Sequence, residues 1–298
     1  MTTVFQGLSV FPITPSDPAG QPDGDALGRL LERLKKAEVN SVALLGSTGG
    51  YAYLSRPQRR RAVEVAVEVL AGGPPLIVGV GALRTDEAQA LARDARAAGA
   101  AALLMAPVSY TPLTEEEVYQ HYRAVAGAAD LPLCIYNNPG TTGFTFSDSL
   151  LFRLAKIESI RAVKMPLPAT GPVAEELARL RLELPAGFVI GYSGDWGCAE
   201  ALLAGADAWY SVIGGLLPVP AMKLARAAKA GDAAEVRRID QAFQPLWSLF
   251  KELGSLRVVY TAAQLLALAD AVPPRPLLPL SERERRRVEA ALDAVSGI

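Results

Sequence analysis

The sequence predicts a (β/α)8 TIM barrel, an α/β fold in which eight parallel strands close into a cylinder inside a ring of helices. Three observations predict it. Short apolar, β-branched runs recur at a steady interval along the 298 residues. Segments with helical spacing and many Ala, Glu and Arg residues separate these runs. The runs are apolar throughout, which indicates parallel strands that are buried on both faces.

Eight segments have the length and composition of such strands. They are Leu8–Ile13, Ser41–Leu45, Leu76–Val80, Ala101–Met105, Leu133–Tyr136, Ile160–Met165, Phe188–Gly191 and Trp209–Ile213. Helical spacing is found between them, for example in Asp25–Lys36, Gln58–Leu70, Asp86–Ala98, Glu115–Ala128 and Phe146–Lys156. The alternation fits a closed barrel better than an open sheet. We therefore expect the active site at the C-terminal ends of the strands.

After about residue 217 the pattern changes to helical segments alone. These are Val219–Ala230, Ala233–Glu252, Ser255–Ala269 and Ser281–Ala294, with a break at the prolines that follow Val272. The chain is thus expected to have two parts. Residues 1–230 would form the catalytic barrel, and residues 231–298 a C-terminal helical extension packed on it.

The composition is that of a globular protein with a small ligand. Thirty basic residues stand against 31 acidic ones, which argues against a nucleic-acid partner or an anionic membrane. The two cysteines, Cys134 and Cys198, lie in apolar segments, so a reducing compartment is the default. The first ten residues do not resemble a leader, and no apolar segment approaches the roughly 20 residues that span a bilayer. We expect a cytoplasmic protein.

Lys164 stands near the end of Ile160–Met165, a segment that otherwise has the composition of a buried strand. A lysine there can extend to solvent or pair with a carboxylate, because lysines are rarely buried without a partner. A buried lysine can instead act as a nucleophile, since apolar surroundings favour the neutral amine that attacks a ketone. The remaining lysines fall on predicted helical segments, where a solvated helix face explains them: Lys35, Lys36, Lys156, Lys223, Lys229 and Lys251.

Tyr136 ends the fifth predicted strand and precedes Asn137–Gly143, a segment that its proline and glycines are expected to keep out of regular structure. Its hydroxyl would face the barrel mouth and could carry a proton between the lysine nitrogen and a substrate. A tyrosine in a barrel core also fills space and needs only one hydrogen-bond partner. A structural role is therefore the alternative.

A glycine-rich turn, Leu45–Gly50, ends the second predicted strand and contains Ser47 and Thr48. Its small residues expose backbone N–H groups beside two hydroxyls, which suits a carboxylate or a phosphate. The turn alone is not specific, because any turn of this kind can need glycine for a positive φ. The sequence contains neither the dinucleotide-binding fingerprint nor a phosphate-binding loop.

The single histidine, His121, lies in a predicted helix away from any strand end. Zinc sites draw on several His or Cys ligands, and a Ser-His-Asp hydrolase needs its histidine at the mouth. We therefore expect neither a zinc-dependent aldolase nor a hydrolase of that type, and interpret His121 as a helix-surface residue.

The lysine, the tyrosine and the glycine-hydroxyl turn, on the sixth, fifth and second strands, together resemble the dihydrodipicolinate synthase and N-acetylneuraminate lyase family. The resemblance extends over most of the chain. It rests on segments in the family's order and near its spacing: Gly46–Gly49, Tyr136–Pro139 with Thr142 and Gly143, Val163–Lys164, and Ser193–Asp195. Each segment alone is unspecific, but the set is specific.

The resemblance implies a role for each candidate residue. Lys164 would form an imine with pyruvate or another 2-oxo acid, Tyr136 would move protons, and Ser47 and Thr48 would hold the carboxylate of the oxo acid. The bound imine then makes a metal or an organic cofactor unnecessary.

The resemblance also implies an assembly. Tyr110 aligns with a tyrosine that reaches into a neighbouring subunit's site and completes a proton relay with Ser47 and Tyr136. A homotetramer built from two such dimers is expected. Tyr210 falls where the family places a backbone carbonyl near the bound pyruvyl group.

Two positions depart from the family pattern near the expected substrate. Gly50 stands where a glutamate usually follows the glycine-rich turn, and Thr141 replaces the arginine that synthase members use. A threonine cannot pair bidentately with a carboxylate. The resemblance therefore implies imine chemistry at Lys164 more firmly than it implies aspartate semialdehyde as the second substrate.

The sequence thus favours a class I aldolase or lyase that makes or breaks a carbon–carbon bond to an aldehyde. Three alternatives stay open. One is a dehydratase of 2-keto-3-deoxy sugar acids that uses the same imine, and another is dihydrodipicolinate synthase proper. The third is a 2-oxo acid binding protein without turnover.

Overall fold

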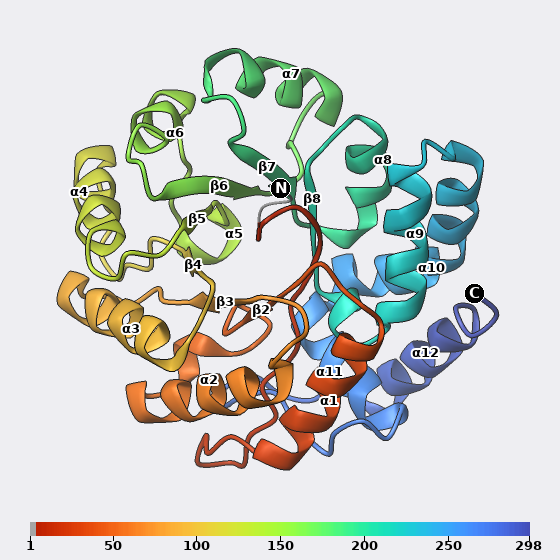
Figure 1. Cartoon of the computed structure of the whole chain (residues 1–298). Helices are drawn as coiled ribbons and strands as arrows, with labels where there is room; N and C mark the ends of the chain where they lie inside the picture. The colour runs from red at the N-terminus through yellow and green to blue at the C-terminus, as the bar shows by residue number, and fades with distance from the viewer. Residues whose placement is uncertain (1–3) are drawn as a thin grey trace.

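A computed structural model describes residues 4–298 and contains a closed barrel of eight parallel strands in the order β1 to β8 (Figure 1). Strand β8 pairs with β1, with Trp209 opposite Leu8, which closes the cylinder. The (β/α)8 fold that the sequence predicts is confirmed. The strands are β1 (Gly7–Val10), β2 (Ser41–Leu44), β3 (Leu76–Gly79), β4 (Ala102–Met105), β5 (Leu133–Tyr136), β6 (Ile160–Met165), β7 (Val189–Tyr192) and β8 (Ala208–Ser211).

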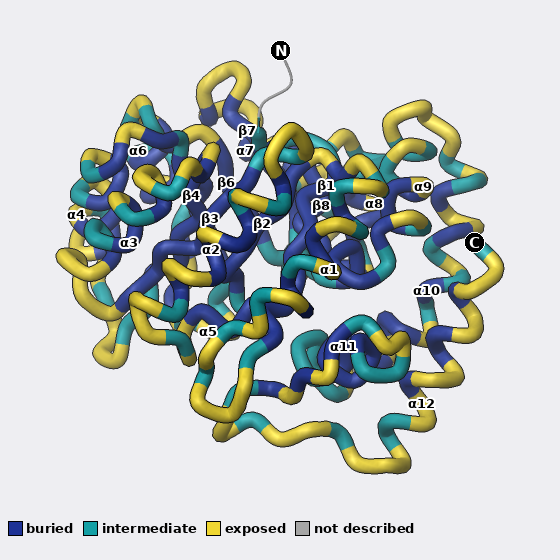
Figure 2. The backbone as a smooth tube through the Cα atoms, turned by 60° about the horizontal axis from the view of Figure 1, so that its bottom comes forward, coloured by how far each residue is buried: buried dark blue, intermediate teal, exposed yellow. Residues whose placement is uncertain are grey.

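Helices surround the barrel, and Figure 2 shows their exposed outer faces around the buried strands. The sequence sets several helix starts. Asp23 caps α1 by accepting a hydrogen bond from the Ala26 N–H, and Thr114 forms a capping box with Glu117 at the start of α4. The outer helices are α1 (Gly24–Lys36), α2 (Arg56–Leu70), α3 (Thr85–Ala98), α4 (Glu115–Ala126), α6 (Asp148–Leu154), α7 (Val173–Glu183), α8 (Cys198–Leu203) and α9 (Pro218–Lys229).

The C-terminal helices α10 (Ala233–Leu253), α11 (Ser255–Leu265) and α12 (Glu282–Asp293) pack on one another, and α10 lies beside α9. In α10 the rings of Phe243 and Trp247 are stacked with centroids 4.8 Å apart. The boundary between a catalytic part at 1–230 and an extension at 231–298 stays a prediction. Among the described residues, no helix is both long and apolar enough to cross a membrane.

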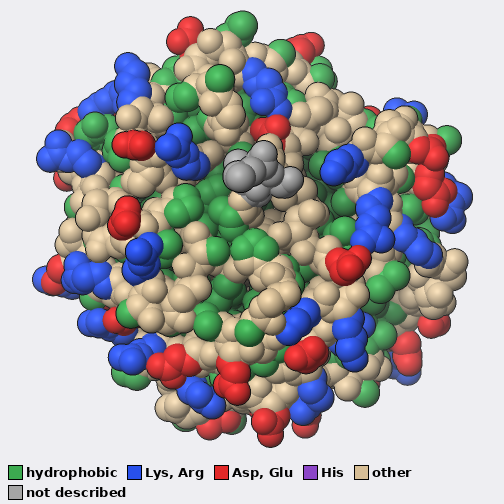
Figure 3. All heavy atoms as spheres, viewed as in Figure 1, with side chains coloured by type: hydrophobic (Ala, Val, Ile, Leu, Met, Phe, Trp, Pro, Cys, Tyr) green, Lys and Arg blue, Asp and Glu red, His purple; other side chains and the backbone are tan. Residues whose placement is uncertain are grey.

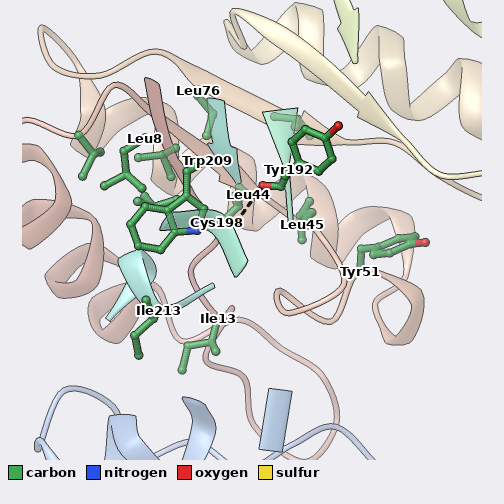
Figure 4. Packing of buried hydrophobic residues seen from close by; sticks show 14 of the residues in the cluster. Leu8, Ile13, Leu44, Leu45, Tyr51, Leu76, Tyr192, Cys198, Trp209 and Ile213 are labelled. Atoms are coloured by element: carbon green, nitrogen blue, oxygen red, sulfur yellow. Dashed lines mark hydrogen bonds between the residues drawn. The ribbon is translucent and has the colours of Figure 1, made fainter. Parts of the chain in front are cut away.

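The core has two parts. One lies between the strands and the helices, where Figure 4 shows Trp209 near Leu8 and Cys198. The other fills the inside of the barrel and includes Phe11 and Tyr210 together with several alanines. Successive side chains of a strand point to opposite faces. Since Ala162 belongs to the interior cluster, Lys164 also points into the barrel.

Charged side chains gather around the rim in the view of Figure 3, with positive and negative ones interspersed, and apolar side chains lie nearer the centre. This distribution matches the near-balance of 30 basic and 31 acidic residues. The barrel surface seen here therefore offers small mixed patches instead of one charged face.

Most predicted elements end within two residues of their observed bounds. The first strand, predicted to end at Ile13, ends at Val10, and the helix predicted to end at Ala269 ends at Leu265. Two of the smaller differences have local causes. Ile213 is not in β8 but in a 3-10 turn (Ile213–Gly215), because its N–H donates to the buried Asp195 carboxylate. Helix α6 begins only after Ser147, whose side chain caps it. Lys156 follows the end of this helix instead of lying on it. Helices α7 and α8 lie outside the helical segments named above.

The segment after β5 contradicts the expectation of irregular structure. Pro139–Thr142 forms a single helical turn, α5, which ends at Gly143 with a φ of 68°. Proline is tolerated in the first turn of a helix, where its missing N–H would have no partner, and glycine readily takes the left-handed conformation that ends one. The two residue types that indicated a break thus start and stop one turn.

Candidate active site

Lys164 lies inside the barrel with only 2% of its surface exposed. Its amine nitrogen, Nζ, is 3.5 Å from the centre of the Phe11 ring, 4.2 Å from that of Tyr136 and 5.9 Å from that of Tyr210. Within residues 4–298, Nζ has neither a hydrogen bond nor a carboxylate partner. The lysine that the sequence singled out is therefore buried against aromatic rings, and its nitrogen is free to meet a carbonyl carbon.

Tyr136 is the direct neighbour of Lys164, since the two residues are paired in the register of β5 and β6. Its hydroxyl oxygen accepts a hydrogen bond from the Asn138 side chain at 3.0 Å. It also accepts one from the Ser47 hydroxyl at 3.4 Å, across the barrel mouth from the turn that follows β2. The structure thus brings together Lys164 of β6, Tyr136 of β5 and Ser47 of the turn after β2.

The turn after β2 is held in an uncommon conformation. Leu45 has a φ of 59°, which is unusual for a residue other than glycine. Its carbonyl oxygen comes so close to Gly79 of β3 that a Cβ atom there would lie 1.9 Å away. The turn therefore depends on the missing side chain of Gly79.

The side chains of Arg59 and Phe11 pack around this turn. The guanidinium group of Arg59 is buried and donates hydrogen bonds to the carbonyls of Gly79 and Gly81 at 2.8 and 3.0 Å. The Phe11 ring lies where a side chain on Gly46 would be, with its nearest atom 2.6 Å from the ideal Cβ position. Thr48 is buried and Ser47 half-buried, so only one of the two hydroxyls faces partly outward.

Asp195 ties the ends of β7 and β8 together. Its buried carboxylate accepts hydrogen bonds from the Trp209 indole N–H at 2.8 Å and from the backbone N–H groups of Val212 and Ile213 at 3.1 and 2.8 Å. Burial raises the pKa of this carboxyl group, and the hydrogen bonds oppose that rise. This residue holds the turn beyond β8 in place.

The sequence profile of the dihydrodipicolinate synthetase family matches residues 4–295. The chain belongs to this family. Relatives named 4-hydroxy-tetrahydrodipicolinate synthase include one from Methylococcus capsulatus, 34% identical over 97% of this chain and 98% of the relative. Another, from Thiobacillus denitrificans, is 35% identical over 96% of both chains.

Solved structures of the dihydrodipicolinate synthetase family agree with the fold. A dihydrodipicolinate synthase from Agrobacterium tumefaciens is 64% identical, covers 99% of both chains and has a TM-score of 0.98. A dihydrodipicolinate synthase from Acinetobacter baumannii, solved with pyruvate, is 29% identical and has a TM-score of 0.90, with 99% of this chain and 100% of that chain covered. The chain is thus a lyase of the aldolase type that works through a lysine Schiff base without a metal.

Two residues of the family's expected site are exposed. Tyr110, between β4 and α4, is 96% exposed. Thr141 is exposed on α5, and its hydroxyl donates to the Asn138 carbonyl at 3.3 Å. Tyr210 is close to the lysine, but through its side chain, which packs edge-on against Phe11. The part that its backbone carbonyl would play stays a prediction.

His121 is not the surface residue that its helix suggested. It is 8% exposed, and its Nδ1 atom lies 2.9 Å from the Thr85 hydroxyl at the start of α3. Burial lowers the pKa of this imidazole. Within residues 4–298, no group of three or more His, Cys, Asp or Glu residues is arranged to hold a metal ion.

Phe11 is the residue near the lysine that sequence reasoning missed. It lies just beyond β1, at an inward-pointing position two residues after Ser9. The alternation of the strand was the available signal. The sequence around Phe11 could not show that its ring would lie against a lysine that is five strands later in the chain.

Proposed function

We propose that Lys164 attacks the C2 carbonyl of pyruvate, or of a closely related 2-oxo acid, and forms an imine. Loss of a proton from C3 then gives an enamine, which adds to an aldehyde, and hydrolysis releases the product and the lysine. The same steps in reverse cleave a 4-hydroxy-2-oxo acid. The observation that carries this proposal is a buried lysine amine beside Tyr136 that has no ion pair with any residue from 4 to 298.

Proton transfer is assigned to the hydroxyl pair of Tyr136 and Ser47. Their hydroxyls are joined by a 3.4 Å hydrogen bond, and the nitrogen of Lys164 lies 4.2 Å from the centre of the Tyr136 ring. In this proposal Ser47 and Thr48 also hold the carboxylate of the oxo acid, because the glycines around them leave backbone N–H groups accessible. The Tyr210 backbone carbonyl would face the bound pyruvyl group.

Tyr110 is assigned to the site of a neighbouring subunit. Because Tyr110 is 96% exposed, its side chain buries almost no surface against its own chain. As the third member of the relay it would need a partner chain, which suits a homotetramer of two dimers. We place the protein in the cytoplasm, where its two buried free cysteines would stay reduced.

The covalent imine takes the place of a cofactor in this proposal. A protonated imine withdraws electrons from C3, which is the task that a zinc ion has in metal-dependent aldolases. Activity should therefore survive exhaustive chelation. Loss of turnover with a chelator that only added zinc restores would overturn this part.

Dihydrodipicolinate synthesis is the second candidate, because the relatives carry that name. It requires recognition of the carboxylate of aspartate semialdehyde. Thr141 offers that group only a neutral hydroxyl, already bonded to the Asn138 carbonyl. An aldehyde without a carboxylate suits the site better.

Borohydride reduction in the presence of pyruvate tests the central step. Mass spectrometry should find one reduced pyruvyl adduct, on the peptide that contains Lys164, and Lys164→Ala should abolish it. Lys251→Ala, at an exposed lysine of α10, is the matched control and should leave the adduct unchanged. An adduct at another lysine while Lys164 stays unmodified would contradict the assignment.

A further inference from the structure

The segments that connect strands to helices around the barrel mouth carry few charges. Between residues 11 and 217 these segments contain only four charged residues, and a single cation among them, Arg84. Arg84 is exposed and paired with Asp86 at 2.9 Å. The other three are Asp17, which accepts from the backbone of its own turn, Asp23, which caps α1, and the buried Asp195.

Each of these four charges already has a partner. These segments therefore present hydroxyls, amides and apolar groups to a second substrate, and each of their charges is already paired. An aldehyde with its own carboxylate would lose water on binding without gaining an ion pair from these segments, which is costly.

Two of these segments form an apolar patch. It consists of Leu167, after β6, and Trp196, after β7. The side chains of both lie close to Gly194, within 3.1 and 3.4 Å of where a Cβ atom would be. Leu167 also fills the space at Gly197, at 2.5 Å from its ideal Cβ position. Two glycines thus form a notch for the leucine, and the indole beside it remains 39% exposed.

The patch follows the two strands that carry Lys164 and its neighbour Gly191. Lys164 is paired with Gly191 in the register of β6 and β7. Just beyond these strands, the backbone N–H and the hydroxyl of Ser193 both donate hydrogen bonds to the Met165 carbonyl. Leu167 is three residues beyond Lys164, so its Cα lies at most about 11 Å away along the chain. With C3 of a pyruvyl imine turned towards the ends of β6 and β7, a group attached to its new bond would reach this region.

We infer that the aldehyde partner is uncharged and carries an apolar, preferably aromatic, group that packs on Trp196 and Leu167. This inference rests on the proposed function. C3 of the enamine forms a bond to the aldehyde carbon, and the aldehyde oxygen takes up a proton. Water then releases a 4-hydroxy-2-oxo acid with the apolar group at C4, with no net oxidation or reduction. Aromatic rings favour offset or edge-to-face contact with an indole.

The test compares three aldehydes with pyruvate as donor: benzaldehyde, the hydroxylated glyceraldehyde and the charged aspartate semialdehyde. We expect kcat/KM to be highest for benzaldehyde. Trp196→Ser should lower that value roughly tenfold and leave glyceraldehyde within about twofold, while Trp196→Phe should restore most of it. Leu182→Ser, at an exposed leucine of α7, is the matched control and should change neither value.

Three results would overturn the inference. One is a preference of the wild type for glyceraldehyde, and another is an equal loss for all aldehydes in Trp196→Ser. The third is a preference for the semialdehyde. Arg275→Ala would then test whether Arg275 binds its carboxylate, since Arg275 lines a cavity of about 270 Å³ with Gly49 and Gly50. Borohydride trapping of pyruvate in each variant separates these results from failure of the proposed function, in which the wild type itself would give no adduct at Lys164.

Discussion

The amine nitrogen of Lys164 lies 3.5 Å above the centre of the Phe11 ring. A ring face attracts a positive charge by about 0.5–2 kcal/mol, depending on how far the pair is removed from water. The protonated imine would carry its charge on this same nitrogen. Phe11 is therefore placed to stabilise the covalent intermediate without touching the reacting carbon atoms.

Phe11→Leu should lower kcat roughly two- to thirtyfold, with a smaller change in KM for pyruvate, because the ring face acts on the charged intermediate. Phe5→Leu is the control, since Phe5 is equally buried in the barrel interior. Steady-state kinetics together with urea unfolding separate lost catalysis from lost packing. Equal kinetic losses in both variants would assign the effect to packing.

Mixing two inactive proteins should restore activity if Tyr110 serves a neighbour. Tyr110→Phe lacks the relay hydroxyl and Lys164→Ala lacks the nucleophile, but a mixed dimer of the two contains one site with both groups intact. Turnover after subunit exchange is the measurement. Absence of recovery, with mixed dimers demonstrated by native mass spectrometry, would mean that Tyr110 does not act across an interface.

Thr141→Arg should raise kcat/KM for aspartate semialdehyde about ten- to a hundredfold, because a charged hydrogen bond contributes about 1.5–3 kcal/mol. Use of a neutral aldehyde should change little. Thr142→Arg, one residue further on α5, is the neighbouring control. An unchanged rate with the semialdehyde would show that this position does not set specificity.

Asp195→Asn should destabilise the protein by about 1–3 kcal/mol, since an amide presents an N–H group to donors that now meet a carboxylate. It should also raise KM for pyruvate by displacing the turn beyond β8. Asp240→Asn is the control, because Asp240 likewise accepts from an indole, that of Trp247 at 2.9 Å, but on α10. Urea unfolding and pyruvate kinetics check both effects, and a normal KM in Asp195→Asn would refute the positioning role.

The ion pair between Asp94 and Arg56 should make stability depend on acid pH. Arg56 donates two hydrogen bonds to Asp94, at 2.6 and 2.8 Å, and holds the pKa of that carboxyl group below its ordinary value. Because the pKa of this carboxyl group is lower in the folded protein, the ion pair stabilises the fold at pH values above the unfolded pKa of about 4. This contribution is lost as the pH falls through the folded pKa.

Because Arg56 is about half exposed, the gain is at most about 1 kcal/mol. Urea unfolding of wild type and Asp94→Asn should therefore differ near neutral pH and converge in acid. A difference that stays constant with pH would contradict the electrostatic origin.

The sequence predicted the parts of the site that follow from strand periodicity. Lys164 and Tyr136 stand at inward positions near the ends of adjacent strands, so a barrel necessarily brings them together. The glycines around Ser47 likewise indicated a turn open to an anion. These inferences needed only the alternation of side chains and the closure of the sheet.

What the sequence did not predict depends on contacts between distant segments. His121 is buried because Thr85 from another helix meets its ring, and Phe11 contacts Lys164 only after the barrel closes. The helical turn of α5 arises from a proline and a glycine that, in sequence alone, also indicate irregular structure. In each case local composition permits two outcomes, and packing selects one.

Lys164 and Tyr136 belong to hydrogen-bonded strands, whereas Thr141, Leu167 and Trp196 belong to the segments that follow them. Mutations in the segments after the strands can therefore alter the surroundings of a second substrate without moving Lys164 or Tyr136. Under the proposed function, relatives that share a third of their sequence with this chain would be able to keep the same nucleophile and differ in the molecule to which they join its adduct.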